Sequence, residues 1–257
     1  MAISITHLGT ATTILEIDGV RLLTDPVFDA PGPKWSFGWG MTSVMTAPVA
    51  IAKEDVGPID AVLLSHDQHG DNLDHAGRKY LEGAKQVITT NAGAKRLGAA
   101  GIRVIGLQPF SSMALKGESG ARLRITATPA RHGPPLSGPF VGDVIGFVLE
   151  GDDGSVVYVT GDTVFYGGVA EVAKRFAAVT HVVAHLGCAA YGPLRFTMNA
   201  NEAVKLARAF GSATIVPIHY DGWTHFKEPR TKVESAFSTA GLGDRIVWLE
   251  RGVARAF

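Results

Sequence analysis

The sequence predicts one layered α/β domain that spans residues 1–257. Short apolar runs bounded by glycine, proline and aspartate indicate strands, and they recur in both halves of the chain. After the first quarter, segments with helical periodicity alternate with these runs. No internal repeat, low-complexity linker or shift in composition divides the chain. We therefore expect a single α/β domain rather than two modules.

The first quarter is rich in strands. Ile3–Leu8, Thr12–Ile17 and Arg21–Thr24 are predicted strands, with Asp18-Gly19 as a hairpin turn between the last two. The segment Asp25–Pro48 has little periodicity but contains Trp35, Phe37 and Trp39. It predicts a long ordered loop, and such loops often form a lid or a binding wall.

The rest of the chain alternates strands with helices. Strands are predicted at Ala61–Ser65, Gln86–Thr90, Arg103–Leu107, Leu123–Thr128, Val144–Leu149, Val156–Thr160, His181–Ala184, Thr214–Ile218 and Ile246–Leu249. Helices are predicted at Leu73–Leu81, Ala92–Ala99, Gly168–Ala177, Asn201–Phe210 and Lys232–Ala240, the first with Asn72 or Asp71 as its N-cap.

Charge and cysteine content restrict the partners and the compartment. Lysine plus arginine and aspartate plus glutamate number 24 each, so nothing favours nucleic acid or an anionic membrane. The single Cys188 excludes an internal disulfide framework and suits a reducing compartment. Residues 1–7 show no signal peptide, and apolar runs such as 179–186 are too short to span a bilayer. We expect a soluble cytoplasmic protein with a small-molecule substrate, and self-association into a homo-oligomer stays open.

The most informative stretch is Ala61–Asp74, where an apolar run leads directly into His66, His69, Asp71 and Asn72. The run reads as a buried strand, and the polar cluster follows it in a loop before the next helix. Imidazole nitrogen and carboxylate oxygen are the ligands that divalent cations such as zinc accept. The loop therefore predicts a metal site.

Four further clusters place similar residues at strand ends, namely His132, Asp162, His185 and His219. Each residue alone is ordinary, because strand-end histidines usually form hydrogen bonds and aspartates often stabilise turns. Five such clusters in one chain favour a shared site at one edge of a sheet. By contrast, His7, His75 and His181 are assigned structural roles.

With these residues the chain resembles the metallo-β-lactamase superfamily over nearly its whole length. The stretches Ile5–Thr12 and Leu22–Phe28 look like the start of its ascorbate-phosphate lactonase-like and N-acylphosphatidylethanolamine phospholipase D-like branches. Ser65–Asp74 is similar to the family motif His-x-His-x-Asp-His. The resemblance implies a four-layer αββα sandwich with His132, a bridging Asp162 and His219 as further metal ligands.

The chain also departs from the family motif. Two residues separate His66 from His69, where the family has one, so either His66 or Asp67 is the first ligand. Asn72 stands where the third histidine belongs, and Thr10 stands where the lactonase-like branch often has histidine. Because oxygen ligands suit manganese better than zinc, we expect one or two divalent ions, Zn²⁺ or Mn²⁺.

The resemblance assigns the ligands to two sites. The first site contains His69 and His132, together with either His66 or Asp67. The second site contains Asp71 and His219, with Asn72 as a further candidate. Asp162 bridges the two sites. His185 either completes a metal shell or protonates the leaving group, and His225 is a second candidate for the proton. Asp67 and Asp221 are candidates for orienting the ligands.

The expected function is metal-dependent hydrolysis. A bound cation lowers the pKa of water to about 7 and so supplies hydroxide at neutral pH, and Asp71 orients this nucleophile. The 25–48 loop and the residues Tyr220, Trp223 and His225 are expected to line the pocket. A lactone and a phosphodiester are the leading substrates, with an amide or β-lactam behind them. The alternative is a non-catalytic or weakly active metal- or ligand-binding domain whose site has degenerated.

Overall fold

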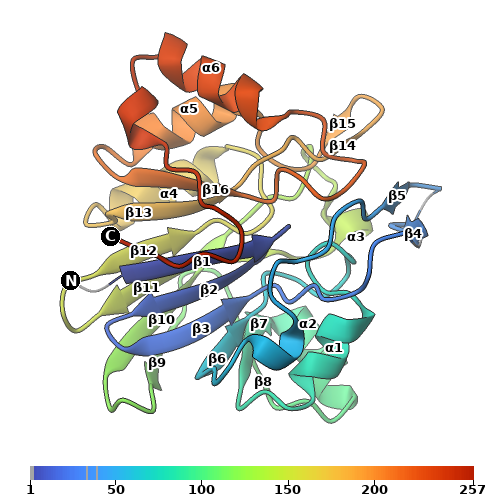
Figure 1. Ribbon diagram of the computed structural model, residues 1–257, viewed down its shortest axis with the longest axis vertical. Coiled ribbons are helices and arrows are strands. Elements are labelled where there is room, and N and C mark those ends of the chain that lie inside the picture. The colour runs from blue at the N-terminus through green and yellow to red at the C-terminus, as the bar shows by residue number, and fades with distance from the viewer. Residues whose placement is uncertain (1–2, 33, 39) are drawn as a thin grey trace.

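Two β-sheets pack face to face, and helices cover the outer face of each sheet (Figure 1). The computed structural model describes residues 3–32, 34–38 and 40–257, so Met1, Ala2, Pro33 and Trp39 lie outside the described residues. This four-layer αββα arrangement confirms the fold class predicted from the sequence. None of the helices in the described ranges is long and apolar enough to cross a bilayer.

The first sheet has seven strands and contains the N-terminal hairpins. Their spatial order is β17 (Arg255–Ala256), β1 (Ile3–Gly9), β2 (Thr12–Ile17), β3 (Val20–Thr24), β6 (Ala61–Leu63), β7 (Val87–Thr90) and β8 (Val104–Leu107). Asp18 and Gly19 both have positive φ angles, as a tight turn between β2 and β3 requires. Helices α1 (His75–Leu81) and α2 (Asn91–Ala99) cover its outer face through a cluster that includes Leu81 and Leu97.

The second sheet has six strands and holds most of the C-terminal half. Their spatial order is β16 (Thr214–Ile218), β13 (His181–His185), β12 (Val156–Val159), β11 (Ile145–Gly151), β10 (Arg122–Pro129) and β9 (Ser112–Lys116). Its outer face is covered by α4 (Gly167–Arg175), α5 (Ala200–Ala209) and α6 (Arg230–Thr239). Strands β12, β13 and β16 are parallel, so the residues that follow them emerge at one edge.

The main core lies between the sheets, where aliphatic side chains of both inner faces interdigitate. The alternation of side chains along each strand places one set here and the other set against the helices. Within β12, for example, Val157 and Val159 belong to the inner core, whereas Tyr158 packs with the helices. Burial on both faces explains why these strands appear in the sequence as continuous apolar runs.

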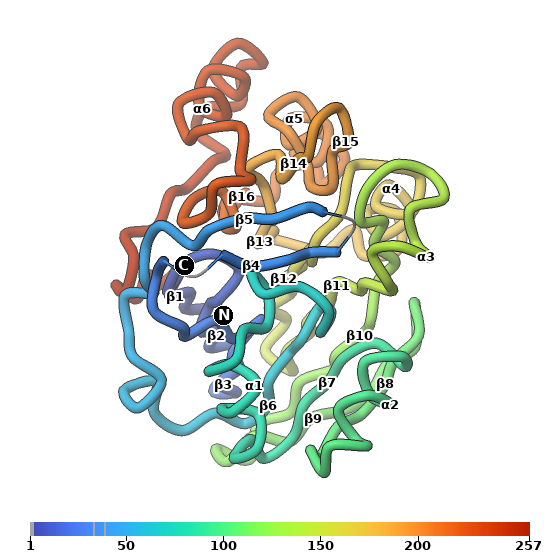
Figure 2. The backbone as a smooth tube through the Cα atoms, turned by 90° about the vertical axis from the view of Figure 1, so that its right-hand side faces the viewer, coloured from blue at the N-terminus to red at the C-terminus, as the bar shows by residue number. Residues whose placement is uncertain are grey.

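Several smaller elements lie near the edge where the strand ends meet. The 25–48 segment is not structureless, because it contains a hairpin of β4 (Lys34–Ser36) and β5 (Thr42–Val44). Figure 2 shows this hairpin extending towards α3 (Gly138–Val141) and the hairpin of β14 (Ala190–Tyr191) and β15 (Leu194–Arg195). The 3₁₀ turns η1 (Lys53–Asp55) and η2 (Gly243–Arg245) complete the described elements.

Two predictions about local structure are wrong. The N-cap of α1 is Asp74, whose Oδ1 accepts a hydrogen bond from Gly77 N (2.6 Å), rather than Asn72 or Asp71. Residues 246–249 form no strand, since only Ile246 makes a bridge, to Ile215. The strand β9 was not predicted, although its alternating Met113 and Leu115 carry the period-two signal over a short length.

Candidate metal centre

The strand ends deliver their polar residues to one buried place at the edge of the sandwich. The loop after β6 supplies His66, His69 and Asp71, while His132, Asp162 and His219 follow β10, β12 and β16. These six side chains form two groups, His66–His69–His132 and Asp71–Asp162–His219, and within each group the potential ligand atoms lie within 4.8 Å of one another. All six residues are buried.

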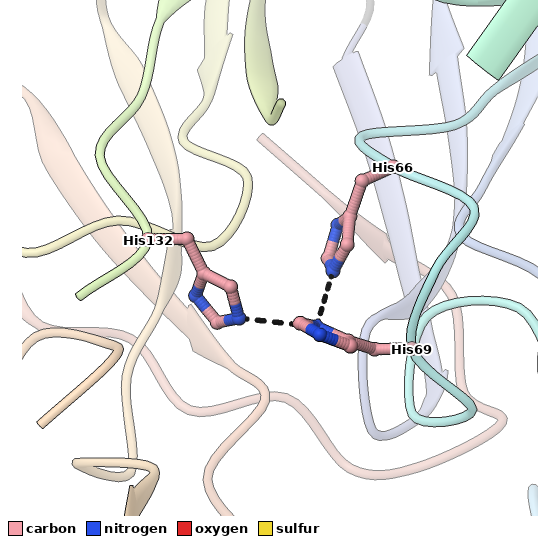
Figure 3. Close-up of side chains that lie close together, drawn as sticks. All are labelled: His66, His69 and His132. Carbon is pink, nitrogen blue, oxygen red and sulfur yellow. Dashed lines mark hydrogen bonds between the residues drawn. The ribbon is translucent and has the colours of Figure 1, made fainter. Parts of the chain in front are cut away.

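The three histidines of the first group aim ring nitrogens at one another (Figure 3). Nδ1 of His69 lies 3.0 Å from Nε2 of His66 and 3.1 Å from Nε2 of His132. Nδ1 of His132 lies 3.1 Å from the carbonyl oxygen of Phe196, which only accepts, so this nitrogen donates and Nε2 carries the lone pair. Burial lowers the pKa of all three imidazoles, so they are neutral donors for a cation.

The residues of this group fit a metal ion. Imidazole nitrogens bound to zinc at about 2.0–2.1 Å in a tetrahedral shell lie about 3.3 Å apart, close to the spacing here. A single nitrogen of His69 cannot give a full hydrogen bond to two neighbouring rings. Three buried rings that share one centre are therefore better satisfied by a cation than by one another.

The second group is anionic and poorly satisfied. Nε2 of His219 lies 3.2 Å from Oδ2 of Asp71 and 3.6 Å from Oδ1 of Asp162. Oδ1 of Asp71 and both carboxylate oxygens of Asp162 are buried without a hydrogen-bond partner among the described residues. Because buried carboxylates need partners or a metal, this group also fits a cation. His219 is held at φ +57°, a strained conformation that is common at functional sites.

The second group, unlike the neutral histidine group, is charged. Burial raises the pKa of Asp162 to about 6, whereas hydrogen bonds from His219 and His225 overcome burial and hold the pKa of Asp71 well below its usual range. Burial lowers the pKa of His219, but the charges of Asp162, Asp71 and Asp25 outweigh it and raise this pKa to about 9. Without metal, His219 therefore carries a proton at neutral pH.

Metal binding is expected to release this proton. The ligand must be a neutral imidazole, so at pH 7 binding displaces about one proton from His219, while His66, His69 and His132 are already neutral. Affinity should then rise about tenfold per pH unit between pH 6 and 8. Isothermal titration of the metal-free protein in buffers of different ionisation enthalpy measures the proton count. A binding constant that does not change over this pH range would contradict the assignment.

The structure brings His66, and not Asp67, to the histidine group. Both oxygens of Asp67 accept hydrogen bonds from Arg96, at 2.8 Å from Nε and 2.5 Å from a terminal nitrogen. The guanidinium of Arg78 also donates to the Asp67 backbone carbonyl. These contacts fix the backbone between His66 and His69, so Asp67 positions the ligand loop.

Loss of the Arg96 guanidinium should loosen this loop. We expect Arg96→Ala to weaken metal binding about 10- to 100-fold, the usual cost of removing a group that orients a ligand. Arg96→Lys should recover part of the loss, because a lysine reaches Asp67 with one donor. Competition with a chromophoric chelator measures the affinity. Arg175→Ala, which removes an exposed ion pair with Glu171, is the control and should bind metal normally. Equal affinity in Arg96→Ala and wild type would rule out this role.

A cavity of about 50 Å³ opens beside the two groups. His69, Asp71, His132, Ser43 and His225 provide its polar wall. Its apolar wall consists of Phe37, Met41, Val141, Ala189, Ala190, Tyr191 and Phe196, together with Thr42. No lysine or arginine is among these residues, so the cavity suits an uncharged molecule.

The 25–48 loop lines this cavity as expected, but of Tyr220, Trp223 and His225 only His225 does. Its Nε2 lies 3.0 Å from Oδ2 of Asp71, and its Nδ1 lies 2.7 Å from Oγ of Ser43. Trp223 is buried behind the wall against Val27 and Met45. Tyr220 lies between the rings of His7 and Trp248, outside the lining.

The other predicted residues lie deeper or farther away. His185 is fully buried behind His219, with ring centroids 5.5 Å apart, and does not line the cavity. Nδ2 of Asn72 donates to Oγ of Ser65 (3.4 Å), while its Oδ1 has no described partner. Asp221 pairs with Arg251. His75 is exposed beside Asp29, and His181 is half-buried at the start of β13.

Sequence reasoning missed several residues of this site. The main one is Asp25, whose Oδ1 accepts a hydrogen bond from Ser65 N (2.7 Å) and whose Oδ2 lies 3.4 Å from Nε2 of His185. Burial raises the pKa of Asp25 to about 7. Its place at the end of a predicted strand was a usable signal. Tyr191 and Phe196 gave none, since no ligand-type residue stands beside them.

Comparisons with known proteins agree with this architecture. Residues 20–220 match the family model described as a beta-lactamase superfamily domain. Proteins named UPF0173 metal-dependent hydrolase are similar: that of Herpetosiphon aurantiacus is 26% identical over 98% of this chain and 96% of its own, and that of Pelotomaculum thermopropionicum is 28% identical over 75% and 81%.

Solved structures show the same fold. An isothiocyanate hydrolase from Delia radicum gut bacteria is 24% identical with a TM-score of 0.82, and the alignment covers 99% of this chain and 98% of that one. A possible metal-dependent hydrolase from Veillonella parvula is 21% identical with a TM-score of 0.85 over the full length of both chains. The family match, the four layers and the strand-end ligands together show that this chain belongs to the beta-lactamase superfamily.

Proposed function

We propose that this protein is a metal-dependent hydrolase that acts on a small uncharged carboxylic ester, with a lactone as the preferred form. The observation that carries the proposal is the cavity beside the two ligand groups, which is lined by apolar side chains and has no lysine or arginine. A phosphodiester anion would meet no lysine or arginine on this wall, so its charge would be bound by the metal alone. The relatives named metal-dependent hydrolase support the reaction class.

The residues have distinct roles in this reaction. When bound, the metal lowers the pKa of water to about 7 and polarises the ester carbonyl. Asp71 faces the cavity with Oδ1 free to accept a hydrogen bond from the attacking water. His225 contacts Asp71 and lines the cavity, so it is placed to donate a proton to the departing alkoxide. Phe37, Tyr191 and Phe196 exclude bulk water from the reacting atoms.

A substrate panel tests this proposal. The protein is loaded with Zn²⁺ or Mn²⁺ and assayed with small lactones, linear esters, phosphodiesters, thioesters, a β-lactam and an aryl isothiocyanate, whose reacting carbon is also uncharged. We expect hydrolysis of the uncharged esters that chelation abolishes and added metal restores. Phosphodiester hydrolysis without esterase activity would overturn the substrate assignment. No chelator-sensitive hydrolysis, together with no bound metal, would favour the degenerate binding domain.

His225 gives a second test within the cavity. We expect His225→Gln to lower kcat about 10²- to 10³-fold while metal content stays the same, because the proton donor is lost and the ligands stay in place. The loss should shrink for esters with good leaving groups, such as nitrophenyl esters, which depart without protonation. Equal losses for good and poor leaving groups would rule out proton donation by His225.

A further inference from the structure

A third buried pair, Asp25 and His185, lies behind the Asp71–Asp162–His219 group. Neither side chain is more than 2% exposed, and Oδ2 of Asp25 lies 3.4 Å from Nε2 of His185. Nε2 of His185 has no hydrogen-bond partner among the described residues. A polar atom that is buried in this way requires a partner of another kind.

The hydrogen bonds of Thr160 determine which nitrogen of His185 is free. The Thr160 hydroxyl donates to the carbonyl of Gly161 (2.9 Å), so towards His185 it only accepts. It accepts from the backbone N of His185 (3.0 Å) and lies 3.2 Å from Nδ1. Nδ1 therefore carries the ring proton, and Nε2 presents a lone pair towards a carboxylate oxygen. Two acceptors that face each other at this distance require a cation or a proton between them.

The charge of the site points to the cation. Asp25, Asp71 and Asp162 are each at most 3% exposed, and none pairs with a lysine or arginine in the described part of the chain. Once a metal has displaced the proton of His219, these three carboxylates carry more negative charge than one divalent ion offsets. A second divalent ion, bound where Asp162 and His219 also lie, offsets the remaining negative charge.

From this geometry we propose that His185 replaces the histidine missing at position 72, so that the chain binds two divalent ions. The first ion is held by His66, His69 and His132, and the second by Asp71, Asp162, His219 and Nε2 of His185. Asp25 lies against the second ion and fixes the orientation of His185. This inference rests on the proposed metal site, but it concerns the number of ions and the ligands rather than the substrate.

The position of Asn72 explains how His185 can replace the missing histidine. Asn72 and His185 both adjoin Asp25, since the Asn72 amide helps to lower the pKa of that carboxyl and Nε2 of His185 lies 3.4 Å from its Oδ2. The two residues thus reach the same place from opposite sheets, Asn72 from the loop after β6 and His185 from the end of β13. The ring nitrogen that is missing at position 72, in the loop after β6, is therefore supplied by His185 at the end of β13.

Zinc titration tests the proposal without any activity assay. Metal-free wild type is expected to bind two equivalents of Zn²⁺, counted by elemental analysis after dialysis and by calorimetry. His185→Ala should keep the first equivalent and weaken the second by about 100-fold, because a direct ligand is lost. Adding Asn72→His to this variant should restore the second equivalent to within about tenfold. His181→Ala, at the opposite end of β13, is the matched control and should bind two equivalents normally.

Nuclear magnetic resonance of wild type labelled with ¹⁵N-histidine covers the case in which a variant does not fold. With the second equivalent of zinc, two histidines, His219 and His185, should show ligand shifts of the ring nitrogens. A single zinc per chain, an unchanged second affinity in His185→Ala, or a second equivalent that moves only one histidine would overturn the proposal and would indicate that a proton on Asp25 satisfies His185. A chain that binds one zinc and hydrolyses esters would overturn this proposal and leave the proposed function intact. A chain that binds two zinc ions without hydrolysis would support this proposal and overturn the proposed function.

Discussion

Replacing His69 and His219 by alanine together is expected to lower kcat/KM for the ester by about 10⁴-fold or more and to abolish tight metal binding. The two residues belong to different ligand groups, and each is buried with its ring nitrogen facing the other ligands of its group. One substitution removes the nitrogen that lies between His66 and His132. The other removes the imidazole that links Asp71 to Asp162. No ligand group then remains complete.

A matched double variant separates this effect from general damage. His75→Ala with His181→Ala also removes two imidazoles, but one is exposed and the other is half-buried at the far end of β13. We expect this control to keep its metal and most of its activity. Elemental analysis and steady-state kinetics are the measurements, with circular dichroism to verify folding. Hydrolysis that persists in the His69→Ala, His219→Ala protein after exhaustive chelation would refute the metal mechanism.

The sheets could be predicted from the sequence because their strands are buried and apolar. The strand β2 has the predicted bounds, and β1 and β3 differ from prediction by a single residue. Failures occur where tertiary contacts decide the structure. Asp74 rather than Asn72 caps α1, because the side chain of Asn72 is turned into the buried centre. Residues 246–249 contact β16 through one bridge without a continuous ladder.

The ligand types could likewise be predicted, but their pairing could not. Histidines and aspartates at strand ends indicated a metal site, and the structure brings six of them into two groups. The choice between His66 and Asp67 depends on Arg96, which lies on α2, 29 residues along the chain from Asp67. Asp25 approaches Ser65 from 40 residues away. Such long-range contacts leave no local periodicity in the sequence.

The substitution Asp162→Asn is expected to change activity and stability in opposite directions. Asp162 lies between the two groups, and its oxygens are 3.6 Å from Nε2 of His219 and 3.8 Å from Nδ1 of His132. Loss of the shared carboxylate should lower kcat/KM by about 10³-fold and weaken metal binding at both groups. In the metal-free protein the same carboxylate is destabilising, because it is buried without a hydrogen-bond partner among the described residues and the charge of His219 offsets the cost of burial only in part.

The pKa of Asp162 sets the pH range in which the ionised carboxylate destabilises the folded protein. Burial raises the pKa from 3.8 to about 6, so the folded state holds the proton more tightly than the unfolded state. The stability that this carboxyl contributes is therefore present below about pH 4 and is lost as the pH rises through 6, at a cost of about 3 kcal/mol at pH 7.5. Asparagine does not titrate, so metal-free Asp162→Asn should melt several degrees higher than wild type at pH 7.5 and equally at pH 4. Asp244→Asn, an exposed exchange of the same kind, should shift neither. A melting temperature for Asp162→Asn at or below that of wild type in chelator at pH 7.5 would mean that the carboxylate is stabilised by the protein alone, and the argument that this centre is built for a metal ion would fail.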